Sequence, residues 1–177
     1  MEKRSDFVLQ FASLPAGEHS FEYIVNDSFF KAYEHPLLNK ANVSVSVQFQ
    51  KSMNGFQLSI DLKGFITLEC GRCLEEFDMP VILHEDLTIR LVSGEVEESE
   101  DEMIVNISDH AHAFDLAPHL YDYLSLQVPI NAVHSDKKNG KPGCDPKAIE
   151  LLNKASTKKQ TEEIDPRWDV LRKIKLN

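Results

Sequence analysis

Residues 42–50 read NVSVSVQFQ, a strict alternation of polar and apolar side chains. Side chains along a β-strand point alternately to opposite faces, so the four apolar residues of this run share one face, which must be buried. An Asn-Gly pair follows at 54–55 and readily adopts the positive φ angles of a tight hairpin turn. Residues 56–62, FQLSIDL, are therefore predicted to return as an antiparallel strand.

The same alternation predicts further strands beyond this hairpin, at 64–69, 77–83, 87–92 and 103–107. Between the last two lies the acidic run 95–102, whose charges repel one another, and we expect it to form a solvated, mobile loop.

Cap residues and helical spacing predict helices on both sides of these strands. They are expected at 28–34 after Asp27, from Asp115 to the region before Pro129, after Asp145, and at 165–174. The sequence thus predicts a single α+β domain over residues 1–177, built on an antiparallel β-meander of five or more strands. Closure of the meander into a barrel is left open, and helices flank it, including one at the C-terminus.

Charge is distributed unevenly along the chain, whose formal net charge is −10. Residues 1–135 carry 8 Lys and Arg against 22 Asp and Glu, whereas residues 136–177 carry 11 against 7. A basic, partly flexible segment is therefore expected from about residue 136. Because the body repels phosphate backbones, any contact with nucleic acid must come from a local basic patch.

Three cysteines and the absence of long apolar runs indicate where the protein works. An odd, sparse set of cysteines argues against a disulfide framework and favours reduced thiols. The first 21 residues lack the apolar core of a signal peptide, and no run approaches the ~18 apolar residues of a membrane span. We therefore expect a cytoplasmic protein without membrane contact.

The pair Cys70-Gly71-Arg72-Cys73 is the one local motif that suggests site chemistry, because two intervening residues let both sulfurs converge on one ion. Cys144 and His134 are the candidates to complete a four-ligand zinc site if the loop at 131–144 folds back. The alternative is unliganded, partly buried thiols. A redox dithiol is less favoured, because alternation resumes after Cys73 where a redox motif needs a helix.

Other sequence motifs that are typical of enzymes are missing, and no small-molecule substrate is evident. The sequence has no Gly-rich phosphate loop, no G-x-S-x-G and no H-E-x-x-H. His110 and His112 alternate, but surface histidines beside an acidic loop need no metal to explain them. We therefore expect a protein that is not an enzyme.

Basic residues could form one phosphate-binding surface together with the cysteine motif. One lies inside the motif, and the others are spread over the loop after residue 136, the segment before the last helix and that helix itself. These candidates for RNA binding are Arg72, Lys137, Lys138, Lys141, Lys158, Lys159, Arg167, Arg172 and Lys173.

Three blocks in order resemble the YceD family of large ribosomal RNA accumulation proteins. TLECGRC at 67–73 with Phe77 resembles the family's T-L-x-C-x-R-C segment. Residues 114–134 resemble its D-L helix, which ends in a leucine-rich segment and proline, and DPR at 165–167 with Leu171 resembles its closing helix. The resemblance runs from about residue 40 to the end of the chain.

This resemblance implies a bacterial or organellar factor needed for large-subunit ribosomal RNA to accumulate, acting in ribosome assembly with no known catalysis. Many relatives carry a second cysteine pair where this chain has only Cys144, so a four-cysteine zinc site is out of reach. Matched position by position to the family's motifs, the resemblance implies these candidate functional residues: Cys70, Arg72, Cys73, Asp165, Pro166 and Arg167.

Two hypotheses of different classes follow. The first is an assembly factor that binds precursor ribosomal RNA through the basic C-terminal third and the cysteine motif. The second is an adaptor whose acidic body binds a basic ribosomal protein without touching RNA. A Cys-x-x-Cys dithiol oxidoreductase is the third and least favoured alternative.

Overall fold

A computed structural model of the chain describes residues 7–52, 55–97, 99, 101, 103–135 and 143–156. Strands and helices follow one another in this order: β1 (Val8–Leu9), β2 (Gly17–Asn26), α1 (Asp27–Tyr33), β3 (Lys40–Ser52), β4 (Gly55–Glu69), β5 (Glu76–Val92), β6 (Ile104–Ser108), β7 (Phe114–Asp115), α2 (Ala117–Leu126) and α3 (Pro146–Ser156).

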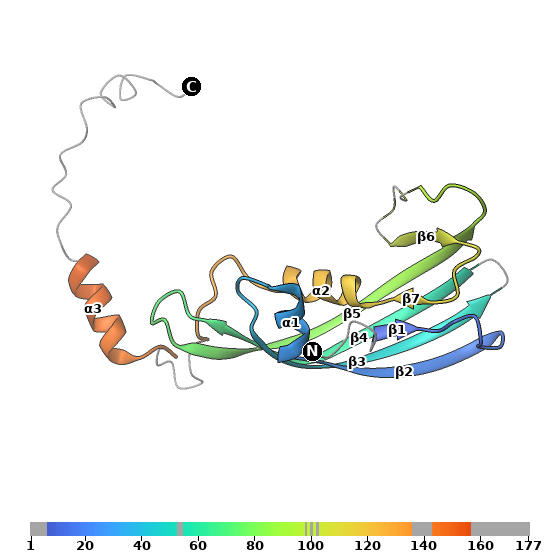
Figure 1. Ribbon diagram of the computed structural model, residues 1–177. Coiled ribbons are helices and arrows are strands. Elements are labelled where there is room, and N and C mark those ends of the chain that lie inside the picture. Colours follow the sequence, from blue (N-terminus) through green and yellow to red (C-terminus); the bar gives the residue numbers. More distant parts are fainter. Residues whose placement is uncertain are drawn as a thin grey trace, which may run out of the picture.

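One five-stranded sheet, in the order β2-β3-β4-β5-β6, forms the body of the molecule (Figure 1). Its first four strands are antiparallel, and the predicted hairpin is confirmed because Ser52 pairs with Gly55 across the β3–β4 turn. β1 and β7 form a separate two-stranded sheet. The predicted α+β class is confirmed.

One detail of the predicted meander is wrong, and the question of barrel closure is answered. β6 runs parallel to β5, with Thr88 opposite Ile104 and Val92 opposite Ser108, because the chain after β5 crosses back before it pairs. The sheet is also open and does not close into a barrel, since within the described ranges β2 and β6 pair on one side only.

Strand boundaries differ from the predicted ones in length. The runs predicted at 56–62 and 64–69 are one strand, β4, and those at 77–83 and 87–92 are one strand, β5. β2 was not predicted, although Phe21, Tyr23 and Val25 alternate with polar residues along it. The long strands bring the two ends of the sheet far apart.

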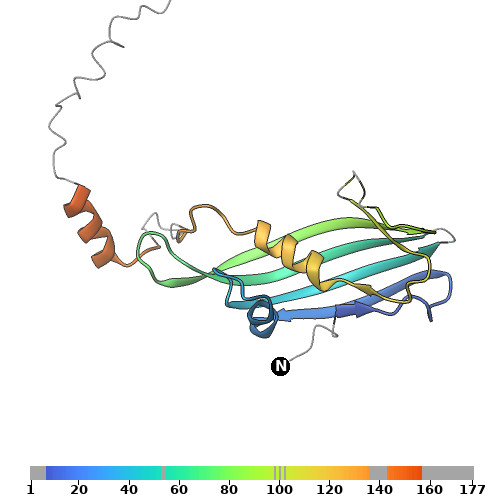
Figure 2. The same ribbon diagram turned by 45° about the horizontal axis from the view of Figure 1, so that its top comes forward.

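The two faces of the sheet differ in what covers them. The alternating apolar residues of β3 and β4 point to one face, where α1, α2, β1 and β7 lie over them (Figure 2). Burial of apolar side chains on this face is the main stabilising term of the fold. The other face of the five-stranded sheet is open (Figure 1), and the alternate side chains of β3, β4 and β5 on it are mostly polar.

The described helices begin near the predicted caps. Asn26 caps α1 by accepting a hydrogen bond from the Ser28 N–H, one residue before the predicted Asp27. Asp115 accepts from the Ala117 N–H at the start of α2, and Asp145 accepts from the Lys147 N–H at the start of α3. The helix predicted at 165–174 lies outside the described residues.

Helix α3 stands apart from the sheet at one end of the molecule (Figure 1). Its leucines are largely exposed, Leu151 by 67% and Leu152 by 47%. In the acidic run, the side chains of Glu95, Glu97 and Asp101 are exposed. No helix in the described part of the chain is long and apolar enough to cross a membrane.

Candidate metal centre

The turn between β4 and β5 carries the cysteine pair. Cys70 follows the last residue of β4, and its backbone closes the turn: its N–H donates to the Glu75 carbonyl and its carbonyl accepts from the Leu74 N–H, both at 2.9 Å. Leu74 has a φ of 61°, which is left-handed and unusual for leucine. This tight turn directs the sulfurs of Cys70 and Cys73 toward the same point.

The chain after α2 returns to this turn and supplies the other two candidate ligands. The Gly71 N–H donates to the Ala132 carbonyl at 2.8 Å, which fixes residues 132–134 beside the turn. The ring of His134 lies 4.8 Å from the ring of Phe77, between ring centroids. Cys144, just before α3, is buried at the same place.

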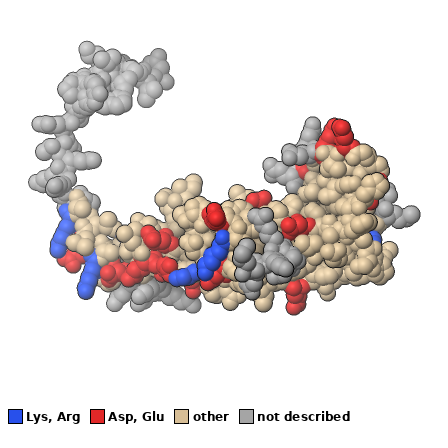
Figure 3. Space-filling model, in the orientation of Figure 1, with Lys and Arg blue, Asp and Glu red and all other residues tan. Residues whose placement is uncertain are grey.

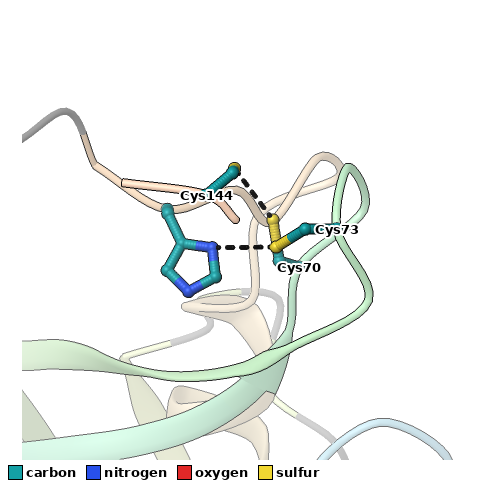
Figure 4. Close-up of side chains that lie close together, drawn as sticks. Cys70, Cys73 and Cys144 are labelled. Atoms are coloured by element: carbon teal, nitrogen blue, oxygen red, sulfur yellow. Dashed lines mark hydrogen bonds between the residues drawn. The ribbon is translucent and has the colours of Figure 1, made fainter. Parts of the chain in front are cut away.

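These four residues converge tightly. The Sγ atoms of Cys70 and Cys144 are 3.7 Å apart, and the Sγ of Cys73 is 3.4 Å from the Nδ1 of His134 (Figure 4). All four ligand atoms lie within 4.8 Å of one another. All four residues are the ones that the sequence analysis selected as candidate metal ligands.

The spacing fits a tetrahedral zinc ion. Zinc–sulfur bonds of about 2.3 Å and zinc–nitrogen bonds of about 2.0 Å at tetrahedral angles put two sulfurs roughly 3.8 Å apart and a sulfur and a nitrogen roughly 3.5 Å apart. The distances of 3.7 and 3.4 Å in the structure agree with these values. Three thiols and one imidazole also form a ligand set typical of structural zinc sites.

The electrostatics of the cluster favour a cation at its centre. Burial raises the pKa of Cys70, but hydrogen bonds from the backbone of Cys73, Arg72 and His134 and from the His134 side chain outweigh it and lower the pKa to about 5. Burial and the adjacent sulfurs of Cys70 and Cys73 raise the pKa of Cys144 to about 11. Ionisation of one thiol therefore makes ionisation of the neighbouring thiol less favourable, and a bound divalent ion would offset this repulsion between thiolates.

Gly143 allows the Cys144 segment to approach His134. A Cβ at this position would lie 2.3 Å from the Ser135 carbonyl oxygen and 2.8 Å from the His134 Cβ. We expect Gly143→Ala to push the two segments apart and to weaken zinc binding about tenfold or more, since misplaced ligands lose affinity as disrupted supporting contacts do. Competition with a zinc-binding dye measures the change.

Gly71→Ala is the matched control, because a Cβ there would meet only the Ala132 carbonyl oxygen at 3.5 Å, an ordinary contact. It should bind zinc within about twofold of the unaltered chain. Equal losses in the two variants would contradict the close approach at Gly143.

The candidate RNA-binding residues are only partly placed. Arg72 is exposed on the turn, between the two cysteines. The remaining candidates lie outside the described residues: Lys137, Lys138, Lys141, Lys158, Lys159, Arg167, Arg172 and Lys173. On the face drawn in Figure 3, several Lys and Arg side chains lie toward the end that carries α3, whereas Asp and Glu are spread along the molecule.

Two other groups of polar side chains lie outside the metal cluster. His110 and His112 are exposed and are not part of the metal cluster. The open face of the sheet holds a Ser-His-Asp arrangement that sequence analysis missed: Ser59 Oγ lies 3.5 Å from His84 Nε2, and His84 Nδ1 lies 3.1 Å from Asp61. Register alone could have found it, because Asp61 pairs with His84 across β4 and β5.

The fold and the cluster define a class: an α+β protein built on a five-stranded sheet that gathers three thiols and an imidazole at one end. The family described as large ribosomal RNA subunit accumulation protein YceD matches residues 58–175, from within β4 through the cluster and α3. The chain therefore belongs to the YceD family. No curated protein and no solved structure matches it.

Proposed function

We propose that this chain is a non-enzymatic, cytoplasmic factor that promotes accumulation of large-subunit ribosomal RNA by binding precursor RNA. The family description connects its members with accumulation of this RNA. The observation that carries RNA binding is the position of Arg72, which is exposed between Cys70 and Cys73, two residues of the candidate metal cluster.

The charge distribution supports contact at this end of the molecule. The open face of the sheet carries Glu18, Glu22, Asp61 and Asp86, which repel phosphate. The cationic part of the sequence follows the cluster directly, with 11 Lys and Arg after residue 135. RNA phosphates are therefore expected to meet the turn and the segment beyond it, without base readout.

Zinc in the cluster would have a structural role. Cys70 and Cys73 would hold it from the β4–β5 turn, and His134 and Cys144 from the returning chain. Four protein ligands fill a tetrahedral site and leave no position open for a substrate, unlike catalytic zinc. The ion would connect the sheet to α3 and to the basic residues that follow.

Catalysis is not part of the proposal, for three physical reasons. The Ser59, His84 and Asp61 side chains lie on an open sheet face, with His84 and Asp61 exposed by 56% and 42%. Backbone N–H groups of a central strand are paired in the ladder, so they cannot form the oxyanion hole that acyl transfer requires. Cys70 is fully buried and follows a strand, which disfavours a redox dithiol.

Arg72→Ala is expected to weaken binding to a large-subunit precursor RNA fragment by about tenfold and to reduce the slope of log affinity against log salt by about one, because one phosphate contact is lost. Filter binding or fluorescence anisotropy over a range of salt concentrations measures both quantities.

Arg90→Ala serves as the control, since Arg90 is exposed on β5 near the opposite end of that strand from the turn. Its affinity and salt slope should match those of the unaltered chain. An absence of salt-dependent RNA binding by the full, zinc-loaded chain would refute RNA recognition altogether.

A further inference from the structure

The outer edge of β2 is an unpaired strand edge. Residues 17–26 pair with β3 without interruption, from Gly17 opposite Lys51 to Asn26 opposite Asn42, and within the described ranges nothing pairs with the other side. In Figure 1, β2 forms the lower margin of the sheet along most of its length. Its outward N–H and C=O groups can pair with another strand.

This edge lacks most devices that normally block strand addition. The ten residues contain no proline, the one-to-one register leaves no bulge, and no described strand is hydrogen-bonded to the edge. Charged side chains are the one protective feature present, and the two on this strand, Glu18 and Glu22, are carboxylates. The edge therefore discriminates between partners by charge.

The two faces of β2 differ in the side chains that an added strand would meet. Glu18, Ser20, Glu22 and Ile24 alternate on the open face and are exposed. Phe21 and Tyr23 are half-buried on the covered face and pack against the core. An added strand would place basic residues beside the carboxylates and apolar residues beside the two aromatic rings.

No cation in the described structure neutralises these carboxylates. Neither Glu18 nor Glu22 takes part in an ion pair there, and their neighbours on β3 are Gln50 and Ser46, which are uncharged. We propose that the β2 edge binds an extended basic segment of a partner protein as a sixth strand. This inference concerns a surface separate from the metal centre and does not depend on RNA binding.

A second copy of the chain fits this edge poorly. The open face of β2 contains no Lys or Arg, so pairing two β2 edges would add two carboxylates and no cation. Antiparallel pairing centred on Ser20 would place Glu18 of each copy opposite Glu22 of the other, and like charges in that position are destabilising. RNA is disfavoured at this edge for the same electrostatic reason.

The test uses the full chain and a capped ten-residue peptide that alternates lysine and valine. The peptide should bind and should slow hydrogen exchange of alternate β2 amides, because edge amides exchange readily until they are paired. A peptide with five lysines followed by five valines has the same composition but cannot present one basic face, and it should bind about tenfold more weakly.

The double variant Glu18→Lys, Glu22→Lys should weaken binding of the alternating peptide by about tenfold or more. The double variant Glu95→Lys, Glu97→Lys makes the same change in net charge at exposed positions of the acidic run and should change binding less than twofold. Equal effects of the two variants would show general attraction and overturn the proposal. Protection, in the free chain, of the β2 amides that point away from β3 would also overturn it, because the edge would already be paired.

Discussion

Cys144→Ser is expected to weaken zinc binding by the full chain by roughly a hundredfold or more, because a four-ligand site shares about 10–16 kcal/mol of binding free energy among its ligands. Serine has almost the size of cysteine, but its hydroxyl does not ionise near neutral pH and cannot replace a thiolate. Competition against a zinc-binding dye gives the dissociation constant, and metal analysis after purification without chelator gives the stoichiometry.

His112→Ala is the control for this experiment, since it removes an exposed imidazole outside the cluster and should leave zinc affinity unchanged. A full chain that retains no zinc and does not compete with the dye would contradict the assignment. The same outcome would leave RNA binding by Arg72 open to its own test, so the two proposals fail separately.

Removal of zinc by a chelator should loosen the structure only near the metal cluster. The core of the sheet is built from residues of β3, β4, β5, α1 and α2, which do not depend on the cluster. We therefore expect hydrogen exchange to accelerate at Gly71 and Leu74, whose N–H groups tie the turn together, while the amides of β3 remain protected. Loss of protection throughout the sheet would show that the ion supports the whole fold.

The sequence was sufficient to predict those parts of the fold that depend on local pattern. The alternation at 43–49 predicts β3, and the Asn-Gly pair indicates where the chain turns back into β4, because strand period and turn position depend on neighbouring residues. The direction of β6, in contrast, is not determined by neighbouring residues. Ile104–Ser108 has the same alternation whether it pairs parallel or antiparallel, and only the path of the preceding chain decides.

The cluster was partly predictable for a similar reason. The spacing of Cys70 and Cys73 shows by itself that two sulfurs can meet, but Cys144 is separated from Cys70 by 74 positions. Its approach depends on the hydrogen bond between Gly71 and Ala132 and on the missing side chain of Gly143. Neither contact has a signature in the sequence, so His134 and Cys144 could be named only as candidates.

Gly64 illustrates how a residue can mislead when its neighbours in space are unknown. In the sequence it begins the second of two runs, which were predicted as two strands. In the structure it lies inside β4, opposite Val43 on one side and Val81 on the other. An isolated glycine within a strand can mark a close approach of another backbone, and β3 approaches at this point.

Gly64→Ala is expected to destabilise the fold by about 3 kcal/mol, because an added Cβ would lie 2.1 Å from the Asn42 carbonyl oxygen and 2.7 Å from the Val43 Cα. These are backbone atoms of a central strand, which cannot rotate away as a side chain can. Urea unfolding of the zinc-loaded chain measures the loss.

Replacing glycine with alanine also stiffens the unfolded chain, which by itself stabilises a protein by about 0.4–1 kcal/mol. Gly71→Ala carries this contribution without the clash, so the difference between the two variants isolates the contact between β3 and β4. If both variants unfold at the same urea concentration, the strands do not approach as closely at Gly64 as described. A large difference in unfolding free energy between the two variants, with the same slope of that free energy against urea concentration, would support the close approach. It would show that β4 can run as one continuous fifteen-residue strand because residue 64 has no side chain.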